Sequence, residues 1–168
     1  MTSRTVYLVR HGLSEANNRD NIGTPAFAST GAPLMELGRE HARKAGVELV
    51  QDWSHDPLMP VAVSELLRTQ ETAFEAGFVR QKTYPILNES YSELDYPALR
   101  QLLDDGDLPA AAFESARLLL ADPPLEKVWF THGLVIAGVC DILGIADQFD
   151  SLIPRFGEIR KIEIMLSS

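Results

Sequence analysis

The chain has 168 residues, of which 45% are hydrophobic and 23% charged, so it can bury one compact core and lacks the composition of a disordered protein. Its formal net charge of -9 argues against nucleic-acid binding, which depends on a clustered basic surface. We therefore expect a single domain over residues 1–168 that does not bind nucleic acid.

The first half of the chain predicts two units in which a short strand is followed by a helix. Residues 5–9 are β-branched and apolar, as in a strand buried on both faces, and helical spacing of apolar residues follows over 35–52. A second apolar run at 60–63 leads into a helix predicted over 65–76. Within the first unit, between its strand and its helix, residues 17–33 are rich in Gly, Pro, Asn, Ser and Thr and predict a long loop.

The second half predicts three more strands and three more helices. The strands are expected over residues 84–87, 128–130 and 158–165, and the helices over 96–103, 109–120 and 134–143. The last strand alternates polar and apolar residues, which is typical of an edge strand exposed on one face. The pattern predicts an α/β fold: a three-layer α/β/α sandwich whose central sheet is mainly parallel, with an antiparallel strand at its edge.

Two His-Gly dipeptides follow predicted buried strands and precede predicted helices. His11-Gly12 comes after the first strand and His132-Gly133 after the fourth, so both imidazoles are expected at the carboxyl edge of the sheet, where ligands bind in open α/β folds. A single histidine is more often a surface or packing residue, but two in the same context point to a shared site. Helix N-termini at both glycines are expected to present backbone N–H groups to an anion.

Two arginines are expected beside these histidines. Arg10 directly precedes His11, and Arg68 lies near the start of the helix after the second strand, after Ser64, a good helix N-cap. An arginine presents a planar fork of donors that binds phosphate oxygens in pairs. Two histidines and two arginines at one sheet edge therefore indicate a phosphate group as the target.

Four blocks of the sequence, in order and spanning most of the chain, resemble the histidine phosphatase (phosphoglycerate mutase-like) superfamily. They are Arg10-His11-Gly12-Leu13-Ser14-Glu15-Ala16-Asn17 for its RHGxSxxN opening, Pro33-Leu34-Met35-Glu36-Leu37-Gly38 for PLTxxG, Ser64-Glu65-Leu66-Leu67-Arg68-Thr69 for SxLxRT, and Thr131-His132-Gly133 for its second HG. A lone RHG would be a weak signal, whereas four ordered blocks are specific.

The resemblance implies that His11 attacks phosphorus and becomes phosphohistidine, which a neutral imidazole can do at physiological pH. Arg10, Arg68 and a protonated His132 are then expected to stabilise the charge on the transferring group. Ser14, Asn17 and Gly133 are expected to help bind substrate, although Ser14 could equally serve only as a helix N-cap.

A general acid is also needed, because the leaving oxygen must take up a proton. Two glutamates compete for this role. Glu89 matches the Leu-Asn-Glu wording of mutases, whereas Glu93 places Tyr96 in the family's E-x-x-Y-G-x-L spacing and is preferred here. Pro97 replaces the glycine of that spacing, which is a departure from the family pattern.

We expect a metal-independent phosphomonoester hydrolase that uses no cofactor and acts on a small phosphorylated substrate. A mutase reaction and a noncatalytic phosphate-binding module are the alternatives. The interval 93–132 lacks the basic cluster that would hold a second phosphate, which favours hydrolysis. Substrate specificity is expected to depend on residues 18–33 and 92–109, whose side chains do not identify the substrate.

The expected location is the cytoplasm, without contact with membranes. Residues 1–10 lack the basic start and apolar run of a secretory signal, and no apolar span approaches ~18 residues. Cys140 is the only cysteine, so no disulfide can form within the chain. No pattern in the sequence indicates an oligomeric state.

Overall fold

The computed structural model describes residues 2–89 and 96–166. Its strands are β1 (Thr2–Arg10), β2 (Val61–Val63), β3 (Gln81–Thr83), β4 (Val128–Thr131) and β5 (Ile159–Leu166). Its α-helices are α1 (Glu36–Val47), α2 (Leu67–Glu75), α3 (Tyr96–Asp104), α4 (Ala110–Ala121) and α5 (Gly133–Ile142). Within these two stretches, no helix is both long and apolar enough to cross a membrane.

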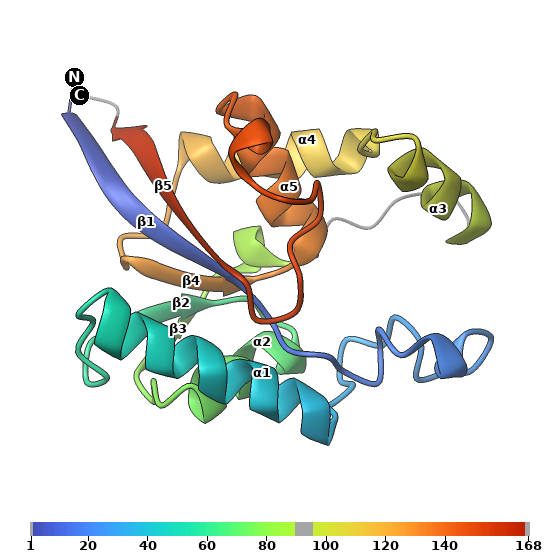
Figure 1. Cartoon of the computed structure of the whole chain (residues 1–168), viewed down its shortest axis with the longest axis horizontal. Helices are drawn as coiled ribbons and strands as arrows, with labels where there is room; N and C mark the ends of the chain where they lie inside the picture. The colour runs from blue at the N-terminus through green and yellow to red at the C-terminus, as the bar shows by residue number, and fades with distance from the viewer. Residues whose placement is uncertain (1, 90–95, 167–168) are drawn as a thin grey trace.

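The strands form one sheet in the order β3-β2-β4-β1-β5. β1, β2, β3 and β4 run parallel, and β5 pairs antiparallel with β1 at the edge, where Val6 lies opposite Ile162. In Figure 1, α1 and α2 cover one face of this sheet, while α4 and α5 cover the other. The predicted three-layer sandwich, mainly parallel with an antiparallel edge strand, is confirmed.

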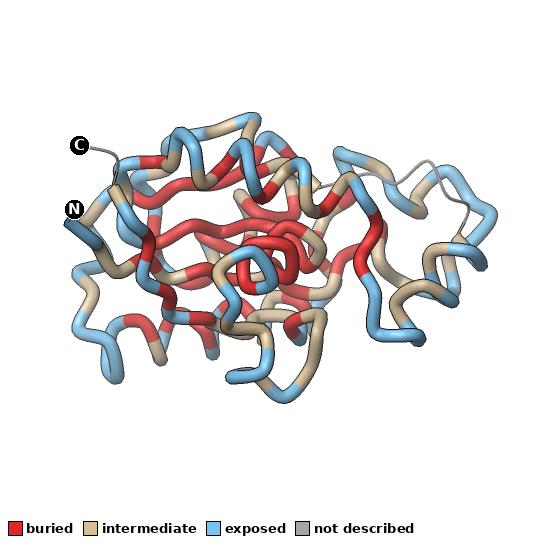
Figure 2. Tube along the Cα trace, turned by 90° about the horizontal axis from the view of Figure 1, so that it is seen from above, coloured by how far each residue is buried: buried red, intermediate tan, exposed pale blue. Residues whose placement is uncertain are grey.

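The central strand β4 is buried on both faces, as Figure 2 shows for the middle of the sheet. Trp129 packs in a cluster with Leu119 of α4 and Ile136 of α5. Its neighbour Phe130 packs on the opposite face with Leu49. Because successive side chains of a strand point to opposite faces, this one apolar run supports both helical layers and holds Thr131 and His132 at the sheet's carboxyl edge.

The predicted strand over 84–87 is wrong. The third strand is Gln81–Thr83, and Pro85–Leu87 forms a 3-10 turn in which the N–H of Asn88 donates to the carbonyl of Pro85. Proline has no N–H to give to a strand ladder, and its fixed φ suits the first position of a helical turn. The helix predicted over 35–52 is confirmed as α1, which continues as a π-helical turn over Glu48–Asp52.

The helix expected directly after Gly12 is also absent from the described residues. The chain stays extended there, because Ser14 forms an antiparallel bridge with Leu34 and the N–H of Met35 donates to the carbonyl of Leu13. The loop predicted over 17–33 follows, with one 3-10 turn at Arg19–Asn21. Only the second His-Gly dipeptide therefore begins a helix, α5.

Candidate active site

His11 and His132 lie side by side because β1 and β4 are neighbouring parallel strands that end at the same edge. The two rings meet edge to face with centroids 5.1 Å apart, and both side chains are fully buried. The backbone N–H of His11 donates to the carbonyl of Thr131, which extends the pairing of the strands to the histidines themselves. The predicted convergence of the two His-Gly motifs is therefore present.

The protonation of His11 follows from its surroundings. Its Nδ1 lies 2.7 Å from the carbonyl oxygen of Gly12, an acceptor, so Nδ1 carries the hydrogen and Nε2 keeps its lone pair. Burial lowers the pKa of His11 well below 6.5, and the charges of Arg10 and Arg68 lower it further. His11 is therefore a neutral imidazole with an available Nε2 at physiological pH.

Gly12 is required by a close approach of two backbone segments. A Cβ at this position would lie 2.1 Å from the carbonyl oxygen of Gly38, and a Cβ on Gly38 would clash with Leu13 in turn. The N–H of Gly12 donates to Oγ1 of Thr72, 3.0 Å away. The glycines of the first and second sequence blocks thus pack together and bring the start of α1 against residues 12–13, directly after His11.

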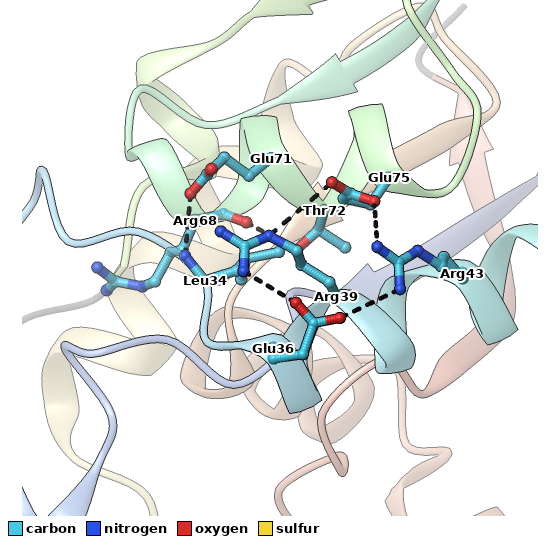
Figure 3. Close-up of polar contacts among 8 residues, drawn as sticks. All are labelled: Leu34, Glu36, Arg39, Arg43, Arg68, Glu71, Thr72 and Glu75. Carbon is cyan, nitrogen blue, oxygen red and sulfur yellow. Dashed lines mark hydrogen bonds and ion pairs between the residues drawn. The ribbon is translucent and has the colours of Figure 1, made fainter.

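Arg68, the second residue of α2, is 2% exposed. Its Nη1 donates to the carbonyl of Ser29 in the long loop, 3.2 Å away. The backbone carbonyl of Arg68 accepts a hydrogen bond from Oγ1 of Thr72. In Figure 3 its guanidinium points away from the ionic network that joins α1 and α2. That network pairs the arginines of α1 with carboxylates of both helices: Arg39 and Arg43 with Glu36 and Glu75.

Arg10 is held by the chain segment that precedes β5. Its Nη1 donates to the carbonyl of Pro154, 2.6 Å away, and its Cζ lies 4.0 Å from the ring centroid of Phe156. Burial lowers the pKa of Arg10 to about 10, and the charge of Glu89 opposes that change, so the side chain stays protonated at neutral pH. A Cβ on Gly133 would lie 3.1 Å from Nε of Arg10, so glycine lets this arginine reach the N-terminus of α5.

The prediction that Ser64 is the N-cap of α2 is wrong, because Leu66 occupies that position. The Ser64 Oγ accepts the N–H of Leu66 at 3.1 Å and lies 2.9 Å from Nε2 of His132 and 2.8 Å from Oγ1 of Thr69. Burial lowers the pKa of His132 well below 6.5, with His11, Arg68 and Arg10 adding to the effect. The expected imidazolium at His132 therefore needs a neighbouring anion.

Four buried nitrogen atoms of this cluster have no hydrogen-bond partner among the described residues: Arg10 Nε, His11 Nε2, Arg68 Nε and His132 Nδ1. Buried polar groups are normally paired, so unpaired groups need an explanation. Three potential donors and one nucleophilic nitrogen in one cluster have the chemistry of an anion site. A concavity of about 640 Å³ beside Tyr7 and Lys127 lies at the opposite edge of the sheet and includes none of the four.

The other predicted binding residues lie on the loop after β1. The Ser14 hydroxyl donates to Oδ1 of Asn17 at 2.5 Å, and Ser14 is fully buried. Asn18, not Ser14, is the N-cap of the following 3-10 turn, so the alternative role of Ser14 as a helix cap is wrong. Their contact with substrate stays a prediction.

Of the two candidate acids, Glu93 lies outside the described residues. Glu89 is described, and its negative charge is the strongest influence that raises the pKa of Arg10, which places it near the cluster. Two contacts hold the segment before it. Thr131 Oγ1 donates to the carbonyl of Leu87, and the N–H of Glu65 donates to Oδ1 of Asn88.

Sequence reasoning missed the contacts that orient the cluster. The sequence predicts Ser64 as a helix cap, whereas its place in the SxLxRT block is the signal that marks it as part of the site. Phe156 and Pro154 belong to no motif, and only the folded chain brings them to Arg10. In the same way, Ser29 carries no local signal for its bond with Arg68.

Comparison with known proteins finds a matching family and several similar folds. The family model of the histidine phosphatase superfamily (branch 1) matches residues 6–128. Among solved structures, TTHB049 from Thermus thermophilus is 25% identical with a TM-score of 0.65, over 97% of this chain and 100% of that one.

Two mycobacterial structures, both below 25% identity, support the fold alone. Mycobacterial hydrolase 1 is 19% identical, with a TM-score of 0.60 over 94% of this chain and 88% of that one. The product of the open reading frame Rv3214 from Mycobacterium tuberculosis is 22% identical, with a TM-score of 0.62 over 94% and 90%. No curated protein sequence matches the chain.

Proposed function

Because the chain belongs to the histidine phosphatase superfamily, we propose that it hydrolyses small phosphomonoesters through a phosphohistidine formed on Nε2 of His11. The observation that carries this proposal is the buried, neutral His11, whose Nδ1 is bonded to Gly12 and whose Nε2 is unpaired. A nucleophile needs an available lone pair, and this hydrogen bond assigns it to Nε2.

In the first step the Nε2 lone pair forms a bond to phosphorus, and the bond from phosphorus to the ester oxygen breaks. The leaving oxygen takes a proton from a carboxylic acid. In the second step the oxygen of water bonds to phosphorus, the bond from phosphorus to Nε2 breaks and returns its electron pair to Nε2, and the same carboxylate takes the proton of the water, which releases inorganic phosphate. The free enzyme is thereby restored with His11 neutral.

Charge on the transferring group is balanced by cations already in place. Arg10 and Arg68 are held by backbone carbonyls of Pro154 and Ser29, so little reorganisation is needed when phosphate arrives. The phosphate dianion also raises the pKa of His132, so His132 gains a proton. Both ring nitrogens are then donors: Nδ1 donates to the phosphate and Nε2 donates to Oγ of Ser64.

For the general acid, Glu89 has support that Glu93 lacks within the described residues. Its charge acts on Arg10, which is the observation that supports Glu89 for this role. Glu93 remains the competing assignment, and the two are separated by an experiment given in the Discussion.

Hydrolysis is favoured over phosphoryl transfer to a second phosphoester. A mutase must hold two phosphate groups, which requires additional cations near the site. The two arginines of α3 and α4, Arg100 and Arg117, are paired with Asp104 and Glu114 on their own helices. Both lie on the surface, which supports a site for one phosphate.

The direct test is hydrolysis of para-nitrophenyl phosphate in EDTA, with release of inorganic phosphate as the readout. Wild type should turn over without added metal, and His11→Ala should be slower by at least about 1,000-fold, as expected when a nucleophile is removed. His55→Ala is the control, because His55 contacts Tyr7 at the other edge of the sheet.

Other outcomes contradict specific parts of the proposal. Equal rates for wild type and His11→Ala would remove His11 as nucleophile. Activity that EDTA abolishes would overturn metal independence, which stays a prediction although no group of three or more His, Cys, Asp or Glu residues suited to a metal occurs among the described residues. Phosphate binding without turnover would favour a noncatalytic module.

A further inference from the structure

A second buried arginine organises the segment that holds Arg10. Arg160 lies in β5 opposite Leu8 of β1 and is 1% exposed. Its neighbours on the inward face of this strand are Ile162 and Ile164, both buried. A guanidinium on an apolar face is costly to bury unless it is fully paired, so its presence calls for an explanation beyond packing.

The Arg160 side chain is paired almost entirely with one segment, residues 149–158, here termed the Arg10 loop. Nη2 donates to the carbonyl of Ser151 at 2.7 Å, Nη1 to that of Leu152 at 3.3 Å, and Nε to Oε2 of Glu158 at 2.7 Å. Its Cζ lies 4.4 Å from the ring centroid of Phe149. One rigid fork therefore joins both ends of the loop.

The same loop meets Arg10 at several points. Between the ends that Arg160 fixes, the carbonyl of Pro154 accepts from Arg10 Nη1, and Phe156 lies against the guanidinium. The backbone is tied as well, because the N–H of Gly157 donates to the carbonyl of Arg10 and the N–H of Arg10 donates to that of Glu158. The position of the Arg10 guanidinium thus depends on a loop conformation that Arg160 sets.

We propose that Arg160 is a positioning residue for the phosphate site: it fixes the Arg10 loop so that Pro154 and Phe156 aim Arg10 at the phosphate. Its effect on turnover rests on the proposed function, whereas its effect on phosphate binding does not. Removing the Arg160 guanidinium should leave Arg10 charged but poorly oriented. Phosphate binding should therefore weaken although the site keeps this cation.

The test is calorimetric binding of inorganic phosphate to the purified chain. Arg160→Met keeps an unbranched apolar stem but removes the guanidinium, and this variant should bind phosphate about 10-fold more weakly, as expected for a misdirected charge-assisted hydrogen bond. Arg160→Lys keeps the positive charge but not the forked guanidinium, and this variant should also bind phosphate more weakly than wild type. Arg4→Met is the matched control, because Arg4 also donates to loop carbonyls, those of Pro124 and Leu125, but at the opposite sheet edge.

A double-variant comparison separates positioning from general destabilisation. In an Arg10→Ala background, Arg160→Met should weaken phosphate binding by less than about twofold, because the group it positions is gone. A full loss of about 10-fold in that background, or an equal loss in Arg4→Met, would overturn the proposal. Hydrolysis retained by His11→Ala would instead overturn the nucleophile and leave these binding results intact.

A second readout does not depend on phosphate binding. The NMR order parameter of the Arg10 Nε–H, assigned by comparison with Arg10→Lys, should fall in Arg160→Met and in Arg160→Lys but not in Arg4→Met. An unchanged order parameter in folded Arg160 variants would contradict the proposal even if wild type bound no phosphate.

Discussion

Oγ of Ser64 lies 2.9 Å from Nε2 of His132 and fixes the orientation of the ring. The other ring nitrogen, Nδ1, has no hydrogen-bond partner among the described residues. Thr69 Oγ1 donates to the carbonyl of Leu66 at 3.0 Å, so Ser64 can donate to Thr69 and accept from His132 at once. This chain of hydroxyls is suited to a protonated His132, because each oxygen passes its own hydrogen away from the ring.

Ser64→Ala should therefore lower kcat by about 10-fold or more, since a hydrogen bond to a charged group contributes roughly 1.5–3 kcal/mol. KM should change less, because both arginines remain. Steady-state kinetics on an aryl phosphate measures both constants. Thr5→Ala, which removes a hydroxyl bonded to Glu163 away from the site, serves as the control. An unchanged kcat in Ser64→Ala would contradict a role for this contact.

Folding stability should fall as the pH is lowered through 6.5. Burial lowers the pKa of both His11 and His132 well below 6.5, so below that pH the unfolded chain binds more protons than the folded chain. Each histidine then contributes a loss of about 1.4 kcal/mol per pH unit. Urea unfolding of wild type and His11→Asn at pH 7.5, 6.5 and 5.5 measures this slope, which the variant should reduce below pH 6.5. Parallel slopes would show that His11 is not buried in its neutral form.

The identity of the general acid can be determined from leaving-group dependence. Without its acid, the enzyme should hydrolyse an alkyl phosphate about 100-fold or more slowly, because the leaving oxygen of that substrate needs a proton. The rate of hydrolysis of para-nitrophenyl phosphate should fall much less. Glu89→Gln is expected to show this pattern and Glu93→Gln is not. The reverse result would assign the acid to Glu93.

Phe27 and Tyr96 join the two segments expected to set specificity. Their rings meet edge to face with centroids 5.5 Å apart, linking the loop after β1 to α3, which lie on the same side of the molecule in Figure 1. Ser29, two residues beyond Phe27, accepts from Arg68, so this contact lies close to the phosphate site.

Phe27→Ala should raise KM for phenyl phosphate by about 3- to 10-fold, the range expected for loss of an aromatic contact. Inhibition by inorganic phosphate should be unchanged, because that ligand lacks the organic group. Phe74→Ala, at an exposed position of α2, is the control. An equal loss for both ligands would place the effect on Arg68 rather than on specificity.

The parts of the fold that sequence could predict are those in which local pattern and burial agree. Val128, Trp129 and Phe130 form a short apolar run before a His-Gly pair, and such a run is typical of a buried strand. By contrast, β3 consists of the polar residues Gln81, Lys82 and Thr83 at the sheet edge, which carry no hydrophobic signal. The apolar residues just after it belong to a proline-initiated turn.

The site was predictable to the extent that motifs place its residues at strand ends. His11, Arg10, Arg68 and His132 do come together, whereas the partners that orient them are set by contacts distant in sequence. Arg160 lies two residues before Ile162, so the strand alternation places it on the apolar face, but no local pattern indicates which groups pair with its guanidinium. The single domain over 1–168, the cytoplasmic location and the absence of nucleic-acid and membrane partners stay predictions.

Phosphorylation of His11 is tested by identifying the phosphorylated residue after rapid quenching of the enzyme during turnover of para-nitrophenyl phosphate. Mass spectrometry under alkaline conditions, which preserve phosphohistidine, should locate one acid-labile phosphoryl group on His11, attached at Nε2, and find none in His11→Asn. Turnover without any phosphorylated His11, or a phosphoryl group on another residue, would show that His11 is not the nucleophile.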